Sequence, residues 1–433
     1  MLVPVWAIAV AALGVVLAVV ALVLLLRARR RVVRIVWAEL CMLLIVASLG
    51  TVFAAARPSG FHFNNRPAPV SPGLQLFLTN PTGVLSGELT ALRATDGSVS
   101  WQRTTSNGVN DYTLADGVLY LAGHSAIGVG GTTTNSVTAL RASDGTQLWN
   151  VTIAATGIIG VSPVVAGGNV YVGLFGLQAS SPRVIVALRA SDGSELWRRA
   201  VDNYSPGPPV VAGGGLVYVP GMGAWRASDG ATTWTRAIGG QWVYDAGTIY
   251  VLTDPGHAQI LALRAADGML LWTADESSGD LVVNSLDVSG GTVYVGLVHA
   301  VNDSQAYLDA LDAATGARRW RDLLPGNAQG TTVAGTVAYV GTTGGLFALD
   351  AATGTVLWHR STGRYIAYHA PRIAGGVLFV ASTNDQRHTD NLCFFGCSDL
   401  GEADYVNAVN ATDGSFYWRQ PLQWAGSPLD VGS

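Results

Sequence analysis

The chain has 433 residues and a formal net charge of −4, so a strong electrostatic attraction to nucleic acid is not expected. Charged residues make up 12% of the chain and hydrophobic residues 49%, a balance opposite to that of disordered proteins. The length allows two or three ordinary domains or one large repetitive domain. Glycine, with 53 residues, and tryptophan, with 13, are both abundant.

The first 56 residues predict a membrane anchor. Residues 2–26 carry no charge and exceed the about 20 residues that a helix needs to cross a bilayer. A second apolar stretch spans residues 35–56, and the loop between the two, residues 27–34, is rich in arginine. Arginine-rich loops stay in the cytoplasm, so everything after residue 56 is expected on the extracytoplasmic side of the cell membrane. The second stretch also fits a cleaved signal peptide ending at Ala54–Ala56, and both interpretations remain open.

A linker containing proline and glycine, residues 57–72, precedes a repeated phrase. The phrase reads ALRASDGSELW at Ala187–Trp197, and eight copies of it follow one another between residue 73 and residue 433. Repeats on this spacing leave no room for a separate globular domain. The tryptophans that end the eight copies are 37 to 60 residues apart: Trp101, Trp149, Trp197, Trp234, Trp272, Trp320, Trp358 and Trp418.

Each copy is preceded by a strand, a glycine turn and a second strand, as in SPVVAGGNVYVG at residues 162–173. The apolar runs are rich in β-forming residues, and the glycine pairs supply the positive φ of tight hairpins. One unit therefore comprises four antiparallel strands, A to D. Eight units predict an all-β, eight-bladed β-propeller over residues 73–433, preceded by two transmembrane helices. Each tryptophan ends the outer strand and is expected to dock on the neighbouring blade.

The repeated Ala-Leu-x-Ala-x-[Asp/Thr]-Gly-x-x-x-Trp with Val-Tyr-Val-Gly strands resembles the tryptophan-docking repeat of the PQQ-like (quinoprotein-dehydrogenase-type) β-propeller family, from about Leu74 to the C-terminus. The resemblance implies one of two roles. Some members are dehydrogenases that bind pyrroloquinoline quinone and calcium at the axis. Others, such as the outer-membrane assembly lipoprotein of this fold, bind no quinone and act as scaffolds.

The dehydrogenase members have a pair of adjacent cysteines and a set of acidic and amide calcium ligands. This sequence has no adjacent cysteine pair, and no Glu–Asn–Asp set aligns with it. The resemblance therefore lies closer to the scaffold members. We expect no catalytic residues and no cofactor, with pyrroloquinoline quinone and calcium as the alternative.

The two ends of the repeat region are incomplete units. Residues 73–80 resemble strand B without a strand A, and residues 426–431 resemble strand A without a strand B. We therefore expect these two segments to pair and close the first blade. Antiparallel order then puts the tight A–B and C–D turns on one face, the turn face. The other face, the loop face, receives the B–C and D–A connections and all the long insertions, at residues 124–136, 174–183, 298–307 and 382–404.

Long loops on a rigid scaffold commonly carry binding sites. We expect a binding face around the axis to include these loop-face residues: Asp111, Tyr112, Tyr204, Trp242, Asn284, Asn327, Tyr365, Tyr368, His369 and Trp424. The longest insertion holds Cys393 and Cys397, which predict a disulfide outside the cytoplasm. Free thiols, or a metal site with His388 and Asp399, are the alternatives.

These features predict a membrane-anchored, extracytoplasmic propeller that binds a protein, an envelope polymer or a small molecule, with its turn face toward the membrane. The first alternative is a quinone-dependent dehydrogenase of alcohols or sugars. The second is a structural subunit whose helices dock into a larger membrane complex.

Overall fold

The computed structural model describes residues 66–83, 86–105, 108–125, 134–154, 157–159, 162–175, 183–201, 211–253, 259–276, 281–299, 302–326, 328–360, 366–368, 370–384, 404–422 and 430–432. The predicted transmembrane segments lie outside these residues. Within them, no helix is both long enough and apolar enough to cross a membrane. The chain divides into two units between Asn64 and Asn65, so residues 66–72 of the predicted linker belong to the second unit, which holds all the described strands.

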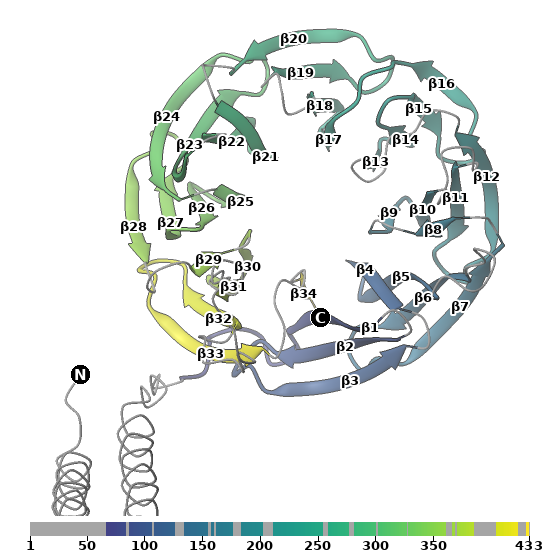
Figure 1. The fold of residues 1–433 in the computed structure, drawn as a ribbon, viewed down its shortest axis with the longest axis horizontal. Helices are drawn as coiled ribbons and strands as arrows, with labels where there is room; N and C mark the ends of the chain where they lie inside the picture. Colours follow the sequence, from purple (N-terminus) through teal and green to yellow (C-terminus); the bar gives the residue numbers. More distant parts are fainter. Residues whose placement is uncertain are drawn as a thin grey trace, which may run out of the picture. The chain divides into compact units, whose positions relative to one another are not determined.

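The second unit is a ring of eight antiparallel sheets, which confirms the predicted all-β, eight-bladed β-propeller (Figure 1). Strand A of each blade lies nearest the centre of the ring and strand D forms the outer edge (Figure 1). The first four blades, from strand A to strand D, are β34 (Asp430–Gly432), β1 (Gln75–Gly83), β2 (Ser86–Arg93) and β3 (Val99–Thr105); β4 (Gly108–Ala115), β5 (Val118–His124), β6 (Asn135–Arg141) and β7 (Gln147–Ile153); β8 (Ile158–Ile159) with β9 (Val164–Ala166), β10 (Asn169–Phe175), β11 (Arg183–Arg189) and β12 (Glu195–Val201); and β13 (Val211–Gly213), β14 (Leu216–Val219), β15 (Gly223–Arg226) and β16 (Thr232–Thr235).

The remaining four blades follow in the same order. They are β17 (Gln241–Asp245), β18 (Thr248–Leu252), β19 (Gln259–Arg264) and β20 (Leu270–Asp275); β21 (Leu281–Ser289), β22 (Thr292–His299), β23 (Asn302–Asp312) and β24 (Arg318–Pro325); β25 (Ala328–Ala334), β26 (Val337–Thr342), β27 (Gly345–Asp350) and β28 (Val356–Arg360); and β29 (Ile366–Tyr368) with β30 (Arg372–Ala374), β31 (Val377–Asn384), β32 (Asp404–Asn410) and β33 (Phe416–Leu422).

The two ends of the ring meet in blade 1. Strand β34 pairs antiparallel with β1, with Gln75 opposite Gly432, Leu76 opposite Val431 and Phe77 opposite Asp430. Blade 1 therefore takes its strand A from the C-terminal end and its other three strands from the N-terminal end of the ring. Pairing between distant segments makes closure of the ring depend on both ends of the unit.

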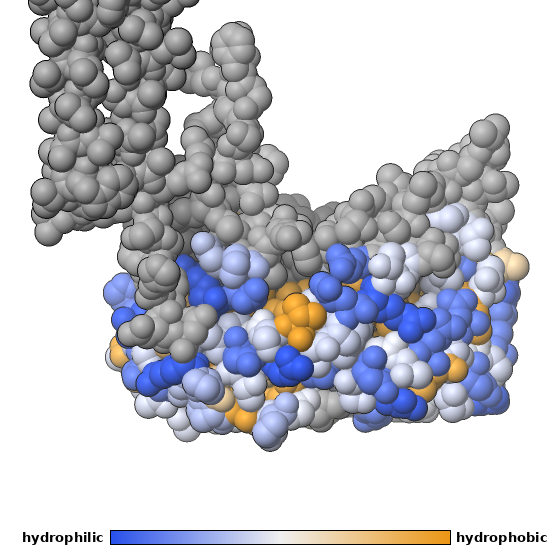
Figure 2. All heavy atoms as spheres, turned by 90° about the horizontal axis from the view of Figure 1, so that it is seen from below, coloured by the Kyte–Doolittle hydropathy of each residue, from blue (hydrophilic) through white to orange (hydrophobic). Residues whose placement is uncertain are grey.

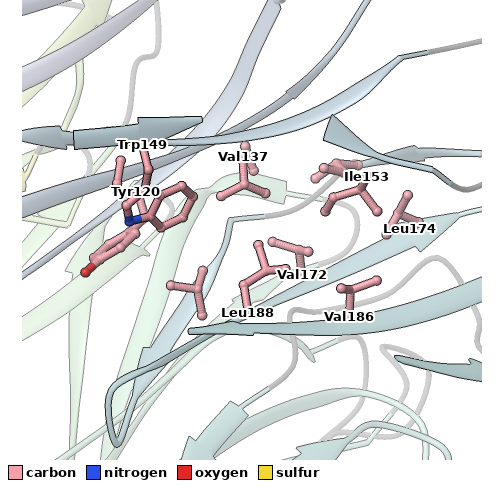
Figure 3. Packing of buried hydrophobic residues seen from close by; sticks show 12 residues of the cluster. Tyr120, Val137, Trp149, Ile153, Val172, Leu174, Val186 and Leu188 are labelled. Carbon is pink, nitrogen blue, oxygen red and sulfur yellow. The ribbon is translucent and has the colours of Figure 1, made fainter. Parts of the chain in front are cut away.

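Apolar side chains fill the space between neighbouring blades. Between blades 2 and 3, Val137 and Ile153 pack against Val172 and Leu188, all at most 4% exposed (Figure 3). Strand alternation points every second residue toward one neighbour, so each blade is buried on both faces. Burying a side chain of this size stabilises the fold by about 1.5–3 kcal/mol.

The eight tryptophans make one repeated contact across every pair of neighbouring blades. Each indole Nε1 donates a hydrogen bond of 2.9–3.0 Å to an alanine carbonyl at the C–D turn of the next blade. The acceptors, in chain order of the donors, are Ala142, Ala190, Ala227, Ala265, Ala313, Ala351, Ala411 and Ala94. The eighth contact runs from Trp418 of blade 8 to blade 1 and completes the ring.

Glycine in the C–D turn allows the tryptophan ring to approach the backbone. A Cβ atom on Gly193 would lie 2.7 Å from Cε3 of Trp149, and the residue has a φ of +74°. The hairpin glycine Gly168, in the same blade, has a φ of +77° but no atom within 4 Å of the same position. Gly193 is thus required for two reasons, its positive φ and its contact with the Trp149 indole, whereas Gly168 is required only for its positive φ.

A charged cluster lies between blades 5 and 6. Glu276 is buried and accepts hydrogen bonds from Arg318 (3.1 Å) and Arg321 (2.9 Å), while the fully buried Asp309 accepts two of 2.6 Å from Arg321. Burial, together with the hydrogen bond to Asp309 and its negative charge, raises the pKa of Glu276 to about 7. Two carboxylates thus compete for the arginines of one interface.

Comparing Gly193 with Gly168 separates the need for positive φ from the need for space beside the tryptophan. We expect both Gly193→Ala and Gly168→Ala to lower the melting temperature, because alanine resists positive φ by about 1–2 kcal/mol. Gly193→Ala should lower the free energy of unfolding by about 1–3 kcal/mol more than Gly168→Ala, because its Cβ displaces the Trp149 ring. Thermal unfolding of the full chain measures both. Equal losses would mean that the dock does not need the glycine.

The charged cluster predicts a pH dependence of stability. Because the pKa of Glu276 is higher in the folded than in the unfolded chain, this group should lower the free energy of unfolding as pH rises from its ordinary value near 4.5 to about 7. Glu276→Gln removes that loss, so the variant should gain melting temperature relative to the parent between pH 5 and 8.

A matched control is Glu195→Gln, since the exposed Arg198 lowers the pKa of Glu195. The stability contributed by Glu195 is present above its ordinary pKa and is lost as pH falls, so this control should show no relative gain with rising pH. A Glu276→Gln difference that stays constant with pH, or that shrinks as pH rises, would contradict the assigned direction.

Candidate functional site

The candidate site is the loop-face end of the inner strands. Two described carboxylates of the inner strands accept hydrogen bonds. Asp111 lies in the half of β4 nearer this end, whereas Asp287 lies two residues before the end of β21 and so toward the turn face. Asp111 lies on β4 and accepts a hydrogen bond of 2.8 Å from the backbone N–H of Tyr112 and another from the hydroxyl of Ser162 in blade 3. This carboxylate therefore connects blades 2 and 3 in addition to lying near the axis.

The second carboxylate, Asp287, lies on β21 of blade 6. It accepts a hydrogen bond of 2.9 Å from the N–H of Val288. Burial raises the pKa of Asp287, and the Val288 N–H and the positive charge of Arg372 on β30 act against this rise. Blades 2 and 6 lie on opposite sides of the ring, so Asp111 and Asp287 are not brought together (Figure 1).

Two aromatic residues predicted for the binding face are buried between blades. The Tyr112 ring is 6% exposed, and its hydroxyl donates a hydrogen bond of 2.6 Å to the Phe77 carbonyl in blade 1. The Trp242 ring is 3% exposed and stacks on Trp234 of blade 4 at 6.2 Å between ring centroids. Both residues lie within inner strands, β4 and β17, and their rings face a neighbouring blade instead of the predicted loop-face surface. A role in binding for either residue stays a prediction.

The inner strands lose regular pairing at one level. In β4, β21 and β25 one residue is bulged out of the register with strand B: Asn110, Asn284 and Gln329. Each lies five residues before the last residue of its strand. In blades 3 and 8 the inner strand is divided into two pieces, β8 and β9 or β29 and β30. Bulges at the rim of a barrel commonly re-aim side chains toward a site.

Several predicted residues lie outside the described part of the chain: Tyr204, Asn327, Tyr365, His369, Trp424, Cys393 and Cys397. The same holds for the centre of each long insertion, including residues 385–403. Asn284 and Tyr368 have described backbones, on β21 and β29. Their placement at the loop-face end of inner strands leaves their predicted role untested.

The described residues can be compared with what a calcium ion requires. Among them, no group of three or more histidine, cysteine, aspartate or glutamate side chains is close enough to hold a metal ion. The two axial carboxylates described above lie in separate blades and accept hydrogen bonds from nearby donors. We therefore derive no reaction step through a quinone.

A group of contact residues was missing from the sequence analysis. In four blades an arginine two residues after the docking tryptophan donates to a carbonyl in the C–D turn of the next blade: Arg103, Arg199, Arg236 and Arg360. The acceptors are the turn glycines, such as Gly145 for Arg103 at 2.9 Å. The recurrence of arginine at this position after tryptophan is a visible sequence signal.

Comparison with solved structures gives the same fold. The BamB protein of Moraxella catarrhalis is 18% identical, with a TM-score of 0.51, over 73% of this chain and 92% of its own. The quinohemoprotein alcohol dehydrogenase ADHIIG of Pseudomonas putida HK5 is 15% identical, with a TM-score of 0.54, over 73% and 71%. The computationally designed Ika8 protein is 13% identical, with a TM-score of 0.53, over 74% and 98%. At these identities the likeness concerns the fold alone.

No curated protein matches this sequence. A family model described as outer membrane protein assembly factor BamB matches residues 63–176, 133–224, 183–322 and 304–433. Together the four overlapping matches span the whole ring. The chain therefore belongs to the PQQ-like β-propeller family represented by that model.

Proposed function

We propose that this protein is a membrane-anchored, extracytoplasmic scaffold that holds a protein or envelope partner at the loop-face end of its inner strands. The family description names an assembly factor, which supports a protein partner. The apolar segments at residues 2–26 and 35–56 support the anchor.

The observation that carries the binding role is the loss of regular pairing at one level of the inner strands. A scaffold with only a structural role could use eight continuous inner strands, because continuous ladders satisfy the most backbone groups. Here five of the eight blades interrupt or bulge the inner strand, and three of the bulged residues are amides. Amide side chains both donate and accept hydrogen bonds, which suits recognition of peptide groups or sugar hydroxyls.

The turn face offers a contrast. Acidic residues of its C–D turns are already engaged within those turns, as when Asp192 accepts from the N–H of Ser194 at 2.9 Å and pairs with Arg189 at 3.3 Å. Asp144 and Asp267 repeat the arrangement with Arg141 and Arg264. Polar groups that are satisfied locally have less to offer a specific partner.

Site-specific crosslinking tests the proposal. A photo-crosslinking residue at position 284 or 368 of the full chain, expressed in its host membrane, should give a discrete adduct. The matched control is position 336, an exposed residue in the A–B turn of blade 7 on the turn face. Adducts confined to position 336, or equal at all three positions, would contradict binding at the loop-face end.

The two alternatives give different results. Pyrroloquinoline quinone with calcium should leave the melting temperature of the purified full chain unchanged. A quinone present at 100 times its dissociation constant would stabilise the protein by about 2.7 kcal/mol, and such a shift would favour a dehydrogenase. Co-purification that depends on residues 1–56 but not on positions 284 and 368 would favour a structural subunit.

A further inference from the structure

Large exposed hydrophobic side chains gather at one end of the outer strands. Seven of the eight such residues in the described part of the chain lie one to three positions after the glycine of a C–D turn. They are 41–53% exposed, and we call them the apolar rim: Val99, Leu148, Met269, Leu270, Leu271, Val356 and Leu357. The eighth, Leu323, lies near the opposite end of β24.

The apolar rim surrounds the turn face from several sides. Its members belong to blades 1, 2, 5 and 7, which are distributed around the ring (Figure 1). In the side view of Figure 2, hydrophobic residues likewise lie among hydrophilic ones along the outer surface of the ring. A flat partner can touch all four blades at once, whereas a small globular partner placed against one blade cannot.

Arginines accompany the apolar rim at the same end of the blades. Arg141, Arg189, Arg226 and Arg264 begin the C–D turns, and their side chains are 48–58% exposed. Each is paired with the aspartate three residues later, at 2.7–3.3 Å. Exposed apolar side chains beside charged ones are typical of surfaces that rest on a bilayer, because the apolar groups enter the headgroup layer while the charged groups stay in water.

The chain also enters the ring at the turn face. The N–H of Arg66 donates to the carbonyl of Tyr417 at 2.8 Å, and its guanidinium donates to the hydroxyl of Ser415 at 3.1 Å. The N–H of Ala68 donates to the carbonyl of Thr95 at 2.7 Å. These partners all lie at C–D turns or just after them. The described part of the chain therefore begins at this end of the blades.

The sequence limits the reach of the segment before Arg66. The second apolar stretch ends at residue 56, and ten residues of fully extended chain span at most about 35 Å. If residues 35–56 cross a bilayer, Arg66 lies no farther than this from the bilayer surface. A turn face tethered so closely, with exposed apolar side chains in four of its eight blades, is suited to contact that surface.

We infer that the apolar rim rests in the headgroup layer of the membrane that holds the predicted anchor. This inference rests on the membrane anchoring in the proposed function. It assigns the turn face to lipid and leaves the loop face for the partner.

Lipid quenching of a site-specific fluorophore tests this contact. The full chain carries Cys41→Ser, Cys393→Ser and Cys397→Ser, and is reconstituted in phosphatidylcholine–phosphatidylglycerol vesicles. Single cysteines are then introduced as Leu271→Cys, Leu357→Cys or Leu323→Cys and labelled with bimane. Leu323 is the matched control, because it is 47% exposed on an outer strand but lies at the other end.

Lipids with a nitroxide near the headgroup should quench bimane at positions 271 and 357 and leave position 323 bright. Equal quenching at all three positions, or none at the rim, would overturn the inference even though the protein floats with the vesicles. Shielding of the rim labels from both nitroxide lipid and iodide would show a protein cover and also overturn it. Failure of the cysteine-free chain to float would instead contradict the anchor itself.

Discussion

The ring depends on one contact, the docking of each outer-strand tryptophan on the turn of the next blade. The indole N–H reaches a backbone carbonyl, and the ring covers a glycine that has no side chain to obstruct it. In most blades the strand B tyrosine packs on the same indole, as Tyr120 does on Trp149 at 5.9 Å between ring centroids. Turn, outer strand and second strand are therefore fixed together at each interface.

This contact explains the composition of the repeat. The glycine must accept positive φ and close approach, and the alanine before the turn must present its carbonyl to the indole. The Asp or Thr of the turn closes the hairpin by accepting backbone hydrogen bonds, as Asp192 does from Ser194. These requirements concern stability, so the repeated phrase carries the architecture and leaves the loop face free to vary.

The fold could be predicted because the same local pattern recurs eight times, and a four-stranded unit with a docking tryptophan has few other ways to bury both of its faces. Closure of the ring could also be predicted, because residues 73–80 resemble a strand B that lacks a strand A and residues 426–431 resemble a strand A that lacks a strand B. The structure pairs β1 with β34, as predicted. Which side chains face the candidate site was harder to predict. Tyr112 and Trp242 had the character of binding residues, but strand alternation turns both into the space between blades.

The cluster of Glu276, Asp309 and Arg321 could not be predicted for a related reason. Its members come from blades 5 and 6 and are brought together only when these two blades pack against each other. The inner-strand bulges likewise depend on register between strands, which the sequence of one strand does not specify. The repeated sequence pattern therefore predicts the features common to all eight blades. Features of single blades depend on contacts between strands and between blades, which the pattern does not specify.

Hydrogen exchange of the full chain with Trp418→Ala tests the central claim most directly, because Trp418 makes the contact that joins the last blade to the first. If the docks hold the ring closed, exchange should quicken in β1, β2, β33 and β34 while β10 through β24 keep their protection. Unchanged exchange in blades 1 and 8, or an equal rise in all eight blades, would contradict the role assigned to the dock.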